Sequence, residues 1–279
     1  MHCMPINRFR QAGSKIANCS GNTNLFIRGA RRSIVKRDSV EIYTAKRGMI
    51  VVESPIKNLV LHRLQEKELT FEELIEVCGK AKSTMSVHLN DLLAMGMVYK
   101  RVDPNDRRRK YFGINSDLLA SSTTPVNVHY NKILQSVPSA VGDKYLFLRS
   151  LFHLVRSGME SYGVDTSPAL KKIGRDVGKM LAPRFKARDA AALLAEVSTF
   201  WEKEGLGRVT VVKGDVPSIV VDDCFDCSAM PDIGRTQCSL DEGILEAIIE
   251  ERLKVQCSIQ ETECYGTGHD HCKFIIKIF

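Results

Sequence analysis

The chain has 279 residues, 44% of them hydrophobic and 26% charged, which is typical of a globular protein. No apolar run approaches the roughly 20 residues that span a bilayer, and the N-terminal stretch lacks the apolar centre of a secretory signal. These features exclude a membrane-spanning chain, and we expect a cytoplasmic protein with no membrane partner. The length allows two modest domains, each with its own hydrophobic core.

Positive charge is concentrated at the start of the chain. The formal net charge is +7, and residues 1–48 hold ten Lys or Arg residues against two Asp or Glu residues. Such a composition is typical of a solvated, disordered arm, although a basic arm can also touch phosphate groups. Because no recognisable domain pattern precedes Met49, we expect a chain that starts there to fold.

Three helices are predicted between residues 54 and 96, where apolar residues recur at helical spacing. In the second helix, Thr70 and Glu73 form a capping-box pattern at the start, and Gly79 is placed to end it. Cys78, near the end of the same helix, is expected to be a small core residue. The third helix has an inward apolar stripe formed by Met85, Leu89 and Leu92.

A basic hairpin is predicted after the helices. The runs MVYKRV and RKYFGI are rich in strand formers and flank the turn sequence DPND. Three helices followed by such a hairpin is the order of a winged helix-turn-helix domain, which we assign to residues 49–115. The stretch STMSVHLNDLLAMGMVYKR resembles the recognition helix and wing of ArsR/MarR-like winged-helix regulators. This resemblance implies that a double-stranded DNA operator is a partner.

Two groups of residues are candidates for DNA contacts. A major groove about 12 Å wide accepts one helix, whose small polar side chains can contact base edges. On the third helix these candidates are Lys82, Ser83, Thr84, Ser86, His88 and Asn90. Basic side chains on the hairpin can neutralise phosphates without discriminating between sequences; they are Arg101, Arg107, Arg108, Arg109 and Lys110. The alternative for the hairpin is a solvated tip with no partner.

The second half of the chain has a different pattern. Residues 116–140 are rich in Ser, Thr, Asn and Pro and are predicted to form a linker. In the domain over residues 141–279, the segment VGDKYLFLRSLFHLVRSGMESYG has the apolar density of a buried or dimer-forming helix, and two more helices follow. Two strands around KGDVP, a helix capped by Ser239 and Glu242, and two closing strands are predicted next. The expected fold is therefore α+β, with a winged helix before a mixed α+β domain.

The end of the chain carries a more specific resemblance. The helix GILEAIIEERL, the strand after it and the motif CYGTGHDHCKFII resemble the end of a 4-vinyl reductase domain, a sensor module that binds small molecules or metals. A winged helix joined to such a domain, with additional cysteines, resembles the MsvR-like redox-responsive regulators of methanogenic archaea. The resemblance implies a transcription regulator that binds its operator more tightly or blocks it when reduced and releases repression when oxidised, and we expect a homodimer. The sequence itself does not show whether the protein represses or activates.

Cysteines are concentrated in the second domain. Nine cysteines in a cytoplasmic chain favour metal binding or redox chemistry over structural disulfides. Cys224 and Cys227 form a CxxC motif, and Cys238 lies at the start of a predicted helix, whose dipole should favour its thiolate. The candidate redox thiols are Cys224, Cys227, Cys238, Cys257, Cys264 and Cys272.

The resemblance also implies a zinc site. In zinc-containing domains of this type, the ligands are a cysteine ahead of the helix, two cysteines around the last turn and a carboxylate near the end of the preceding strand. The three cysteine positions match Cys238, Cys264 and Cys272. Glu261 and Glu263 are candidates for the carboxylate, and Cys257 is an additional thiol that can replace it. The fourth ligand therefore stays open.

Three interpretations of the cysteines remain: a redox-active thiol set that zinc can join, a structural zinc site beside a pocket for a small hydrophobic effector, or inert buried cysteines. The pocket would be lined by apolar faces of residues 145–200. The leading hypothesis is a redox-responsive regulator, with a thioredoxin as a candidate redox partner. A thiol oxidoreductase using Cys224 and Cys227 is disfavoured, because the sequence has no Gly-rich dinucleotide fingerprint, nucleophile elbow or acid/base pair. We therefore expect no enzyme.

Overall fold

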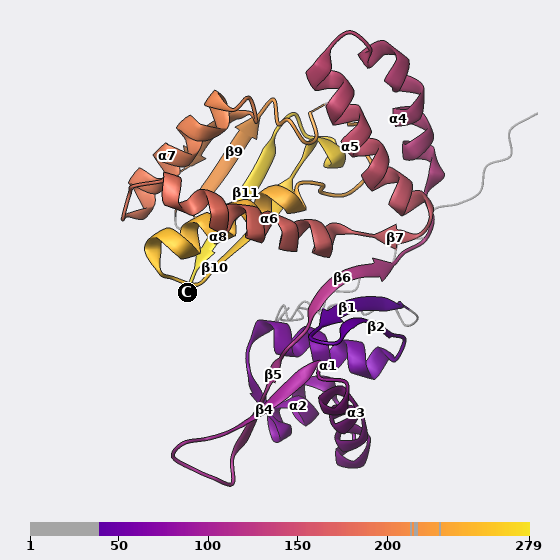
Figure 1. Ribbon diagram of the computed structural model, residues 1–279, viewed down its shortest axis with the longest axis vertical. Coiled ribbons are helices and arrows are strands. Elements are labelled where there is room, and N and C mark those ends of the chain that lie inside the picture. Colours follow the sequence, from indigo (N-terminus) through magenta and orange to yellow (C-terminus); the bar gives the residue numbers. More distant parts are fainter. Residues whose placement is uncertain (1–38, 213, 215–216, 229) are drawn as a thin grey trace, which may run out of the picture. The chain divides into compact units, whose positions relative to one another are not determined.

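The computed structural model describes residues 39–212, 214, 217–228 and 230–279 (Figure 1). Most of the predicted basic arm, including Cys3 and Cys19, lies outside these residues, as does part of the KGDVP turn. Both a winged-helix unit and a mixed α+β unit are present, so the predicted fold class is confirmed.

The winged-helix unit begins with a hairpin, continues with three helices and ends with the wing. The three-stranded sheet of the wing has the order β3-β5-β4 and is antiparallel, with Lys100 opposite Phe112. Its elements are β1 (Glu41–Ala45), β2 (Gly48–Val52), α1 (Pro55–Glu66), β3 (Leu69–Thr70), α2 (Phe71–Cys78), α3 (Lys82–Ala94), β4 (Val98–Val102), β5 (Lys110–Ile114) and β6 (Asp117–Ser122).

Local sequence explains where the helices begin and end. The Thr70 hydroxyl accepts from the Glu73 backbone N–H, and the Glu73 carboxylate accepts from the Thr70 backbone N–H at 2.7 Å, so the predicted capping box is confirmed. Gly79 ends α2 with a φ of 60°, a left-handed conformation in which glycine has no Cβ penalty. Met85 of α3 is fully buried, as its place in the predicted inward stripe requires, and Cys78 joins the same core.

The predicted boundary of the arm at residue 48 is wrong, because the first described strand lies before it. β1 pairs with both β2 and β6, and Tyr43 is completely buried in the winged-helix core. The Tyr43 hydroxyl donates to Glu41 at 2.6 Å, and the Glu41 carboxylate also contacts His62 at 2.9 Å. A chain starting at Met49 would lose this strand.

The predicted linker over residues 116–140 is also wrong, since regular structure fills it. β6 pairs with β1 and β7, and the four-stranded sheet has the order β2-β1-β6-β7. A helix, α4 (Asn127–Ala140), then packs against α5 (Lys144–Ser161). Polar composition predicted a loop here, but Ile133 and Ala140 are buried against their neighbours, and this packing favours the helix.

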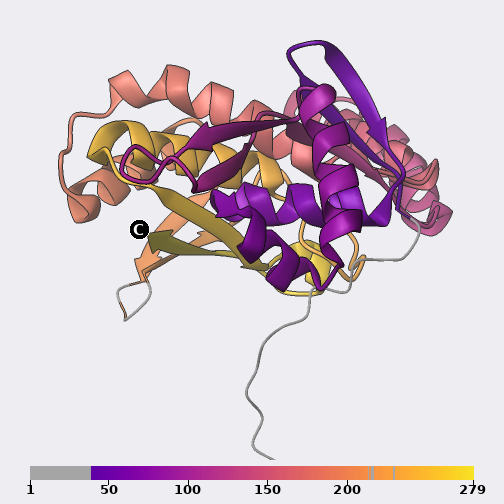
Figure 2. The same cartoon turned by 90° about the horizontal axis from the view of Figure 1, so that it is seen from below.

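The second unit combines a helical layer with a four-stranded antiparallel sheet. The order of the sheet is β10-β11-β9-β8, and α7 and α8 lie on one of its faces (Figure 2). After α5, the elements are β7 (Val164–Asp165), α6 (Ser167–Leu181), η1 (Ala182–Arg184), α7 (Ala190–Lys203), β8 (Arg208–Val212), β9 (Ser218–Asp222), α8 (Ser239–Leu253), β10 (Cys257–Glu263), η2 (Tyr265–Thr267) and β11 (Cys272–Ile278).

Glycines allow α6 and α8 to pack very closely. A Cβ at Gly174 would lie 2.1 Å from the Leu240 carbonyl oxygen, and one at Gly243 would lie 2.0 Å from the Lys171 carbonyl oxygen. Ion pairs between Arg175 and Glu246, 2.9 Å apart, add to this contact. The packing fixes α8, and its N-terminus then lies where the cysteine-bearing loops converge.

Candidate cysteine site and nucleic-acid interface

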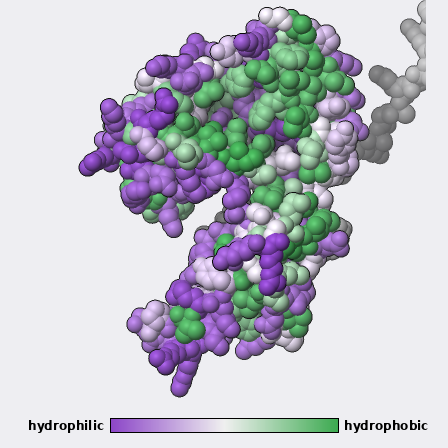
Figure 3. Space-filling model, viewed as in Figure 1, coloured by the Kyte–Doolittle hydropathy of each residue, from purple (hydrophilic) through white to green (hydrophobic). Residues whose placement is uncertain are grey.

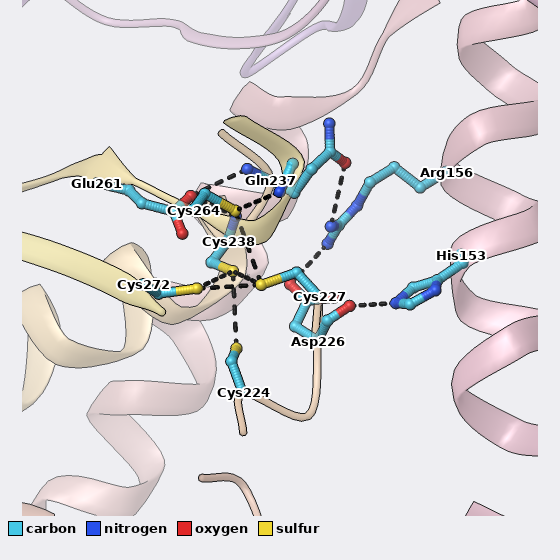
Figure 4. Close-up of polar contacts among 11 residues, drawn as sticks. His153, Arg156, Cys224, Asp226, Cys227, Gln237, Cys238, Glu261, Cys264 and Cys272 are labelled. Atoms are coloured by element: carbon cyan, nitrogen blue, oxygen red, sulfur yellow. Dashed lines mark hydrogen bonds and ion pairs between the residues drawn. The ribbon is translucent and has the colours of Figure 1, made fainter. Parts of the chain in front are cut away.

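Five cysteines converge from three separate segments (Figure 4). Cys224 and Cys227 lie in the loop after β9, Cys238 caps the N-terminus of α8, and Cys264 and Cys272 bracket the loop between β10 and β11. The five residues are at most 1% exposed. The resemblance implied one zinc site for Cys238, Cys264 and Cys272, and the fold brings Cys224 and Cys227, predicted only as redox thiols, to the same place.

The sulfur atoms are close enough to share one metal ion. The Sγ atom of Cys227 lies 3.0 Å from that of Cys272, 3.4 Å from that of Cys238 and 3.6 Å from that of Cys264. The Sγ atoms of Cys238 and Cys272 are 3.8 Å apart. A tetrahedral zinc ion with Zn–S bonds of about 2.3 Å requires S–S separations of about 3.8 Å. These four sulfurs therefore fit such an ion, with the shortest pair moving apart by less than about 1 Å on binding.

Glu261 is the carboxylate that the fold brings to the sulfurs. A carboxylate oxygen of Glu261 and the sulfurs of the same four cysteines all lie within 4.8 Å of one another. Its Oε2 atom accepts from the backbone N–H groups of Gln237 and Cys238, at 2.9 and 2.8 Å. Its Oε1 atom is buried and has no hydrogen-bond partner in the described structure. A buried, unpaired carboxylate oxygen beside thiols is a further donor for a metal cation.

Two glycines shape the loop CYGTGHDHC. A side chain at Gly266 would place a Cβ 2.6 Å from the Arg235 carbonyl oxygen, so the close approach of these two loops requires glycine. Gly268 has a φ of 79°, a conformation that glycine adopts without strain. The backbone N–H of Gly266 also points at the Cys264 sulfur, 3.4 Å away. Such an N–H donor stabilises a thiolate.

The ionisable groups of the site influence one another. Hydrogen bonding with Cys227 lowers the pKa of Cys264, whereas hydrogen bonding with Cys224 and Cys227 raises the pKa of Cys238. Burial, and then the charge on Cys264, raises the pKa of Glu261 to about 8. Because these shifts have opposite directions, only some of the thiols lose their protons in the absence of a metal. A divalent cation would favour the state in which all the ligand thiols are deprotonated.

Two of the predicted ligand candidates lie elsewhere, and for these two the prediction is wrong. Cys257 begins β10 and pairs with Ile278, at the end of the hairpin remote from Cys264. A strand rises about 3.3 Å per residue, which separates the two by roughly 20 Å. Glu263 follows a register shift in β10, and its carboxylate contacts His271 and Lys273, at 2.8 and 3.0 Å.

The start of α8 also differs from the prediction. Cys238 is the N-cap, and its side chain makes no capping hydrogen bond. Glu242 does not close a capping box with Ser239; its carboxylate accepts instead from the Glu261 backbone N–H at 2.6 Å and pairs with Lys171 at 3.0 Å. Cys238 is thus held at the positive end of α8, as expected, but by Glu261 rather than by a capping box.

The CxxC loop is attached to α5 by buried polar contacts that the sequence analysis missed. Arg156 forms an ion pair with Asp226, which lies between the two cysteines, at 3.0 Å, and donates to Gln237 at 3.3 Å. The imidazole of His153 contacts the Asp226 carbonyl oxygen, and burial lowers the pKa of His153 to about 4. The sequence contained a pattern that could have predicted these contacts, because Arg149, His153, Arg156 and Glu160 recur every three or four residues along a helix rich in Leu and Phe.

The candidate DNA contacts on α3 divide into two sets. Lys82, Ser83, Ser86 and Asn90 are exposed, and their spacing places them on one side of the helix. Thr84 and His88 are half-buried and lie toward another side. The exposed set is available to a groove, and its contact with bases remains a prediction.

The wing presents its basic residues to solvent. Arg107, Arg108, Arg109 and Lys110 are all exposed, and Asp103 shapes the tip by accepting from the backbone N–H groups of the residues after Pro104. One groove is lined by residues of both α3 and the wing; they include Ser86, Asn90, Arg108, Arg109 and Lys110. The helix and the wing can therefore contact one ligand together.

Arg101 differs from the other wing candidates. Its guanidinium is paired with the Glu68 carboxylate at 2.5 Å and lies over the Tyr111 ring, 4.8 Å from the centroid. A contact between Arg101 and phosphate would have to compete with this pair, so we expect it to contribute less than its neighbours.

Comparison with known proteins identifies two segments. The model of the MarR family matches residues 54–109, and the model of the 4-vinyl reductase domain matches residues 217–278. Both matches fall where the sequence resemblance places a winged helix and a 4-vinyl reductase domain, and they confirm that resemblance. Within the described residues, each helix is too short or too polar to cross a membrane.

Individual relatives come from a methanogen. Two uncharacterized proteins of Methanocaldococcus jannaschii, MJ0150 and MJ1642, are 29% and 30% identical to the chain over 131 residues. Each alignment covers 46% of this chain, and 75% and 76% of the respective relative. A crystal structure of a vinyl-4-reductase family protein from the same organism matches with a TM-score of 0.35 and 18% identity, covering 54% of this chain and 94% of that one.

Proposed function

The chain belongs to the family of 4-vinyl reductase domain proteins and carries a MarR-family winged helix, and on this premise we propose that it is a redox-responsive, DNA-binding transcription regulator. The observation that carries the proposal is the group of five buried cysteine sulfurs in a domain linked to a DNA-binding module. Contacts of 3.0–3.8 Å between those sulfurs provide the chemistry by which the domain would sense oxidation.

DNA binding is supported by the winged-helix geometry. The MarR-family segment places the exposed polar side of α3 and the arginines of the wing around one groove. We propose that Ser83, Ser86 and Asn90 contact base edges and that the arginines contact phosphates, which position the domain without reading sequence.

We propose zinc as the resident metal of the cysteine site. Its ligands would be Cys238, Cys264 and Cys272, with Cys227 or Glu261 as the fourth. Thiolate-rich, tetrahedral donor sets are typical of zinc, and the separations of the sulfurs fit this geometry. When bound, the metal contributes its binding free energy to the folded state of the domain.

The redox step would join two neighbouring cysteines. A two-electron oxidant such as a peroxide would convert two thiols to one disulfide, and the two protons and two electrons would reduce the peroxide to water. The bond shortens a contact such as the 3.0 Å between the sulfurs of Cys227 and Cys272 to about 2.0 Å. It also removes thiolate donors from the metal, and a thioredoxin-type dithiol could reverse it.

Burial restricts access to the thiols. The five cysteines are at most 1% exposed, so the proposed oxidation requires a local opening of the structure around them. The described residues of the loop from β9 to α8 form no helix or strand, but Arg156 and His153 hold Asp226 of this loop, so an opening there must break these contacts.

A second candidate, a regulator that binds a small hydrophobic effector, is favoured by an apolar cavity. Residues of α7, α8 and the sheet line a partly open pocket of about 220 Å³, with Leu193, Val211, Ile249 and Ile276 in the lining. A cavity of about 150 Å³ lined by aliphatic side chains holds benzene, so this one would accept a single-ring compound. Of the pocket predicted over residues 145–200, only the α7 part takes part in it. In this candidate the cysteine site is purely structural.

The MarR-family match indicates a transcription regulator, and we propose that the protein has no catalytic activity of its own. The test of the function is binding to DNA from the protein's own upstream region, with metal content measured on the same samples. We expect dithiothreitol-treated and peroxide-treated protein to differ in both. Equal binding, with a response to single-ring aromatic compounds instead, would favour the second candidate.

A further inference from the structure

Three donors form a second group at the edge of the cysteine site. The Sγ atoms of Cys224 and Cys238 and a carboxylate oxygen of Asp241 all lie within 4.8 Å of one another. Cys224 and Asp241 are not part of the group formed by Glu261 and the other four cysteines. Figure 4 shows the Cys224 sulfur on the side of Cys238 remote from Cys264. Because a tetrahedral ion takes four donors, Cys224 and Asp241 remain as donors after a first ion is bound.

Cys238 belongs to both groups. Its sulfur lies 3.8 Å from that of Cys224, and it also lies 3.4 Å from that of Cys227 and 3.8 Å from that of Cys272. A thiolate sulfur keeps free lone pairs after it binds one metal ion. Cys238 can therefore be a ligand in both groups at once and bridge two ions.

Asp241 reaches the sulfurs from the first turn of α8. It lies three residues after the N-cap Cys238, the position whose carboxylate closes a capping box by accepting from the N-cap backbone N–H. Here that N–H donates to Glu261 at 2.8 Å, so the Asp241 carboxylate is released from the capping role. The positive end of a helix favours an acidic residue, but it does not explain a carboxylate within 4.8 Å of two buried sulfurs. Ionised groups of like charge at this distance repel one another unless a cation lies between them.

The separation of the Cys224 and Cys238 sulfurs, 3.8 Å, fits a shared metal rather than a disulfide. Two sulfurs on one tetrahedral zinc ion are about 3.8 Å apart, whereas those of a disulfide are about 2.0 Å apart. The sulfurs of Cys227 and Cys272, at 3.0 Å, are the better placed pair for a disulfide. A carboxylate beside a thiol also disfavours the thiolate that disulfide exchange requires, whereas it is a ligand for a cation.

We propose that the cysteine site binds two zinc ions, and that Cys224, Asp241 and a bridging Cys238 hold the second. The inference rests on the proposed function, which places the first zinc ion on Cys238 and its neighbours. A zinc ion with four thiolates has a net charge of about −2, so a second cation beside it reduces the negative charge that the fold must bury. Asp226 adds to that charge: one of its oxygens pairs with Arg156, but Oδ1 is buried and has no hydrogen-bond partner in the described structure. Each ligand thiol releases its proton to solvent as the ions bind.

The donor set favours zinc over other metals. Zinc accepts sulfur and carboxylate oxygen together, whereas calcium and magnesium select oxygen and copper(I) selects sulfur. Cys224, Cys238 and Asp241 supply three ligands, which leaves the fourth position of the second ion open. Zinc ions with an open position exchange ligands, whereas those in closed sets of four serve structure. The second ion should therefore be the more labile of the two.

Asp241 is the donor of this group that solvent reaches. It is half-buried, while Cys224 and Cys238 are at most 1% exposed. Figure 3 shows hydrophobic residues gathered over the region where Figure 1 draws α4 and α5, and α5 holds the CxxC loop through Asp226. A hydrated cation gains nothing from an apolar surface. We therefore expect the second ion to enter and leave past the Asp241 carboxylate.

The test counts zinc in the full chain, which is saturated with zinc, dialysed and kept in a phosphine reductant. Atomic emission gives the zinc per chain, and release to the chelating dye 4-(2-pyridylazo)resorcinol gives the rates. The wild type should hold about two zinc ions and release one of them at least about tenfold faster than the other. Asp241→Asn and Cys224→Ser should each hold about one zinc ion, because loss of a ligand weakens binding of the second ion at least about 100-fold. The slow phase should remain in both.

Two further variants are matched controls. Asp223→Asn removes a carboxylate next to Cys224 that is 73% exposed and paired with Arg208. Cys257→Ser removes a buried thiol at the other end of the β10–β11 hairpin. Both should keep the zinc content of the wild type and both phases of release. Far-ultraviolet circular dichroism should show that all five proteins are folded.

One zinc ion per wild-type chain, or two that survive both ligand substitutions, would overturn the second site and leave the proposed function intact. Loss of the second ion in Asp223→Asn or Cys257→Ser as well would show that the loss does not report on ligands, and would also overturn it. Iron and inorganic sulfide in place of zinc would exclude the arrangement. A wild type without zinc would overturn this proposal together with the resident zinc of the proposed function, whereas two zinc ions in a chain that binds no DNA would refute only the function.

Discussion

Arg156 on α5 and Asp226 between the two cysteines of the CxxC motif form an ion pair whose atoms lie 3.0 Å apart, with side-chain exposures of only 4 and 7%. The pair attaches a loop without regular structure to a long helix. Because Asp226 is flanked by Cys224 and Cys227 within two residues, the pair also determines where those thiols lie. Burial raises the pKa of Asp226 to about 6, and the Arg156 charge opposes this rise.

Removing one member of this ion pair should therefore lower the free energy of unfolding far more than removing both members. Arg156→Leu leaves a buried carboxylate without a cation and should reduce the free energy of unfolding by about 3–5 kcal/mol, whereas Arg156→Leu/Asp226→Leu should recover most of the loss. Arg208→Leu is the control, since its pair with Asp223 is 68 and 73% exposed and should change stability by less than about 1 kcal/mol. Urea unfolding measures all three. A double variant as unstable as Arg156→Leu would contradict the ion-pair account.

Tyr43 should be essential to the winged-helix core. Tyr43→Ala removes a fully buried ring and the hydroxyl partner of Glu41, and it should lower the free energy of unfolding by about 3–5 kcal/mol. Met49→Ala, at a position 76% exposed, should change it by less than about 0.5 kcal/mol. A chain truncated to begin at Met49 should behave like Tyr43→Ala or worse. A stable truncated chain would show that β1 is dispensable.

Metal content should follow the geometry of the cysteine site. Cys264→Ser should lose bound zinc and melt at a lower temperature even in reductant, because metal binding free energy contributes to folding. Cys257→Ser should retain the metal, since Cys257 lies at the other end of the hairpin. Atomic emission on dialysed samples, paired with thermal melts, distinguishes the two. Retention of zinc by Cys264→Ser would mean that Cys264 is no ligand.

The wing arginines should govern the salt dependence of DNA binding. Replacing Arg107, Arg108 and Arg109 by Ala should weaken binding to every sequence and reduce the log–log salt slope by about 0.9 for each lost phosphate contact. Asn90→Ala should instead alter the preference between operator and unrelated DNA. Arg101→Ala should have the smallest effect on the slope, because its guanidinium is held by Glu68. An unchanged slope in the triple variant would mean that the wing does not touch the backbone.

Much of the fold follows from local patterns in the sequence, and the errors have physical causes. The capping box of Thr70 and Glu73 and the stripe through Met85 were recognisable because each depends on residues within one helix. The strand around Tyr43 was missed because the charge of the arm outweighed a short alternating pattern. Its stability comes from pairing with β6, about eighty residues further along the chain, which no local pattern displays.

The cysteine site, too, could be predicted only in part from the sequence. Cys238, Cys264 and Cys272 were selected because the resemblance to the 4-vinyl reductase domain implies ligands at these three positions. The choice between Glu261 and Glu263 depends on a register shift in β10, which only strand pairing reveals. Cys227 joins the site because Asp226 is held by α5, a contact across 70 residues of chain. Spacing along the sequence could not predict either arrangement.

The most direct test of the central claim is the ratio of the dissociation constants for operator DNA after peroxide and after dithiothreitol, measured by fluorescence anisotropy for three proteins. The wild type should show a change of at least about tenfold that dithiothreitol reverses, and Cys257→Ser should match it. Cys227→Ser should bind DNA in reductant but lose most of the response, because it removes the thiol whose sulfur makes the shortest contacts to the other cysteines, at 3.0–3.6 Å. A ratio near one for the wild type, or a full response in Cys227→Ser with none in Cys257→Ser, would contradict control of DNA binding by this site.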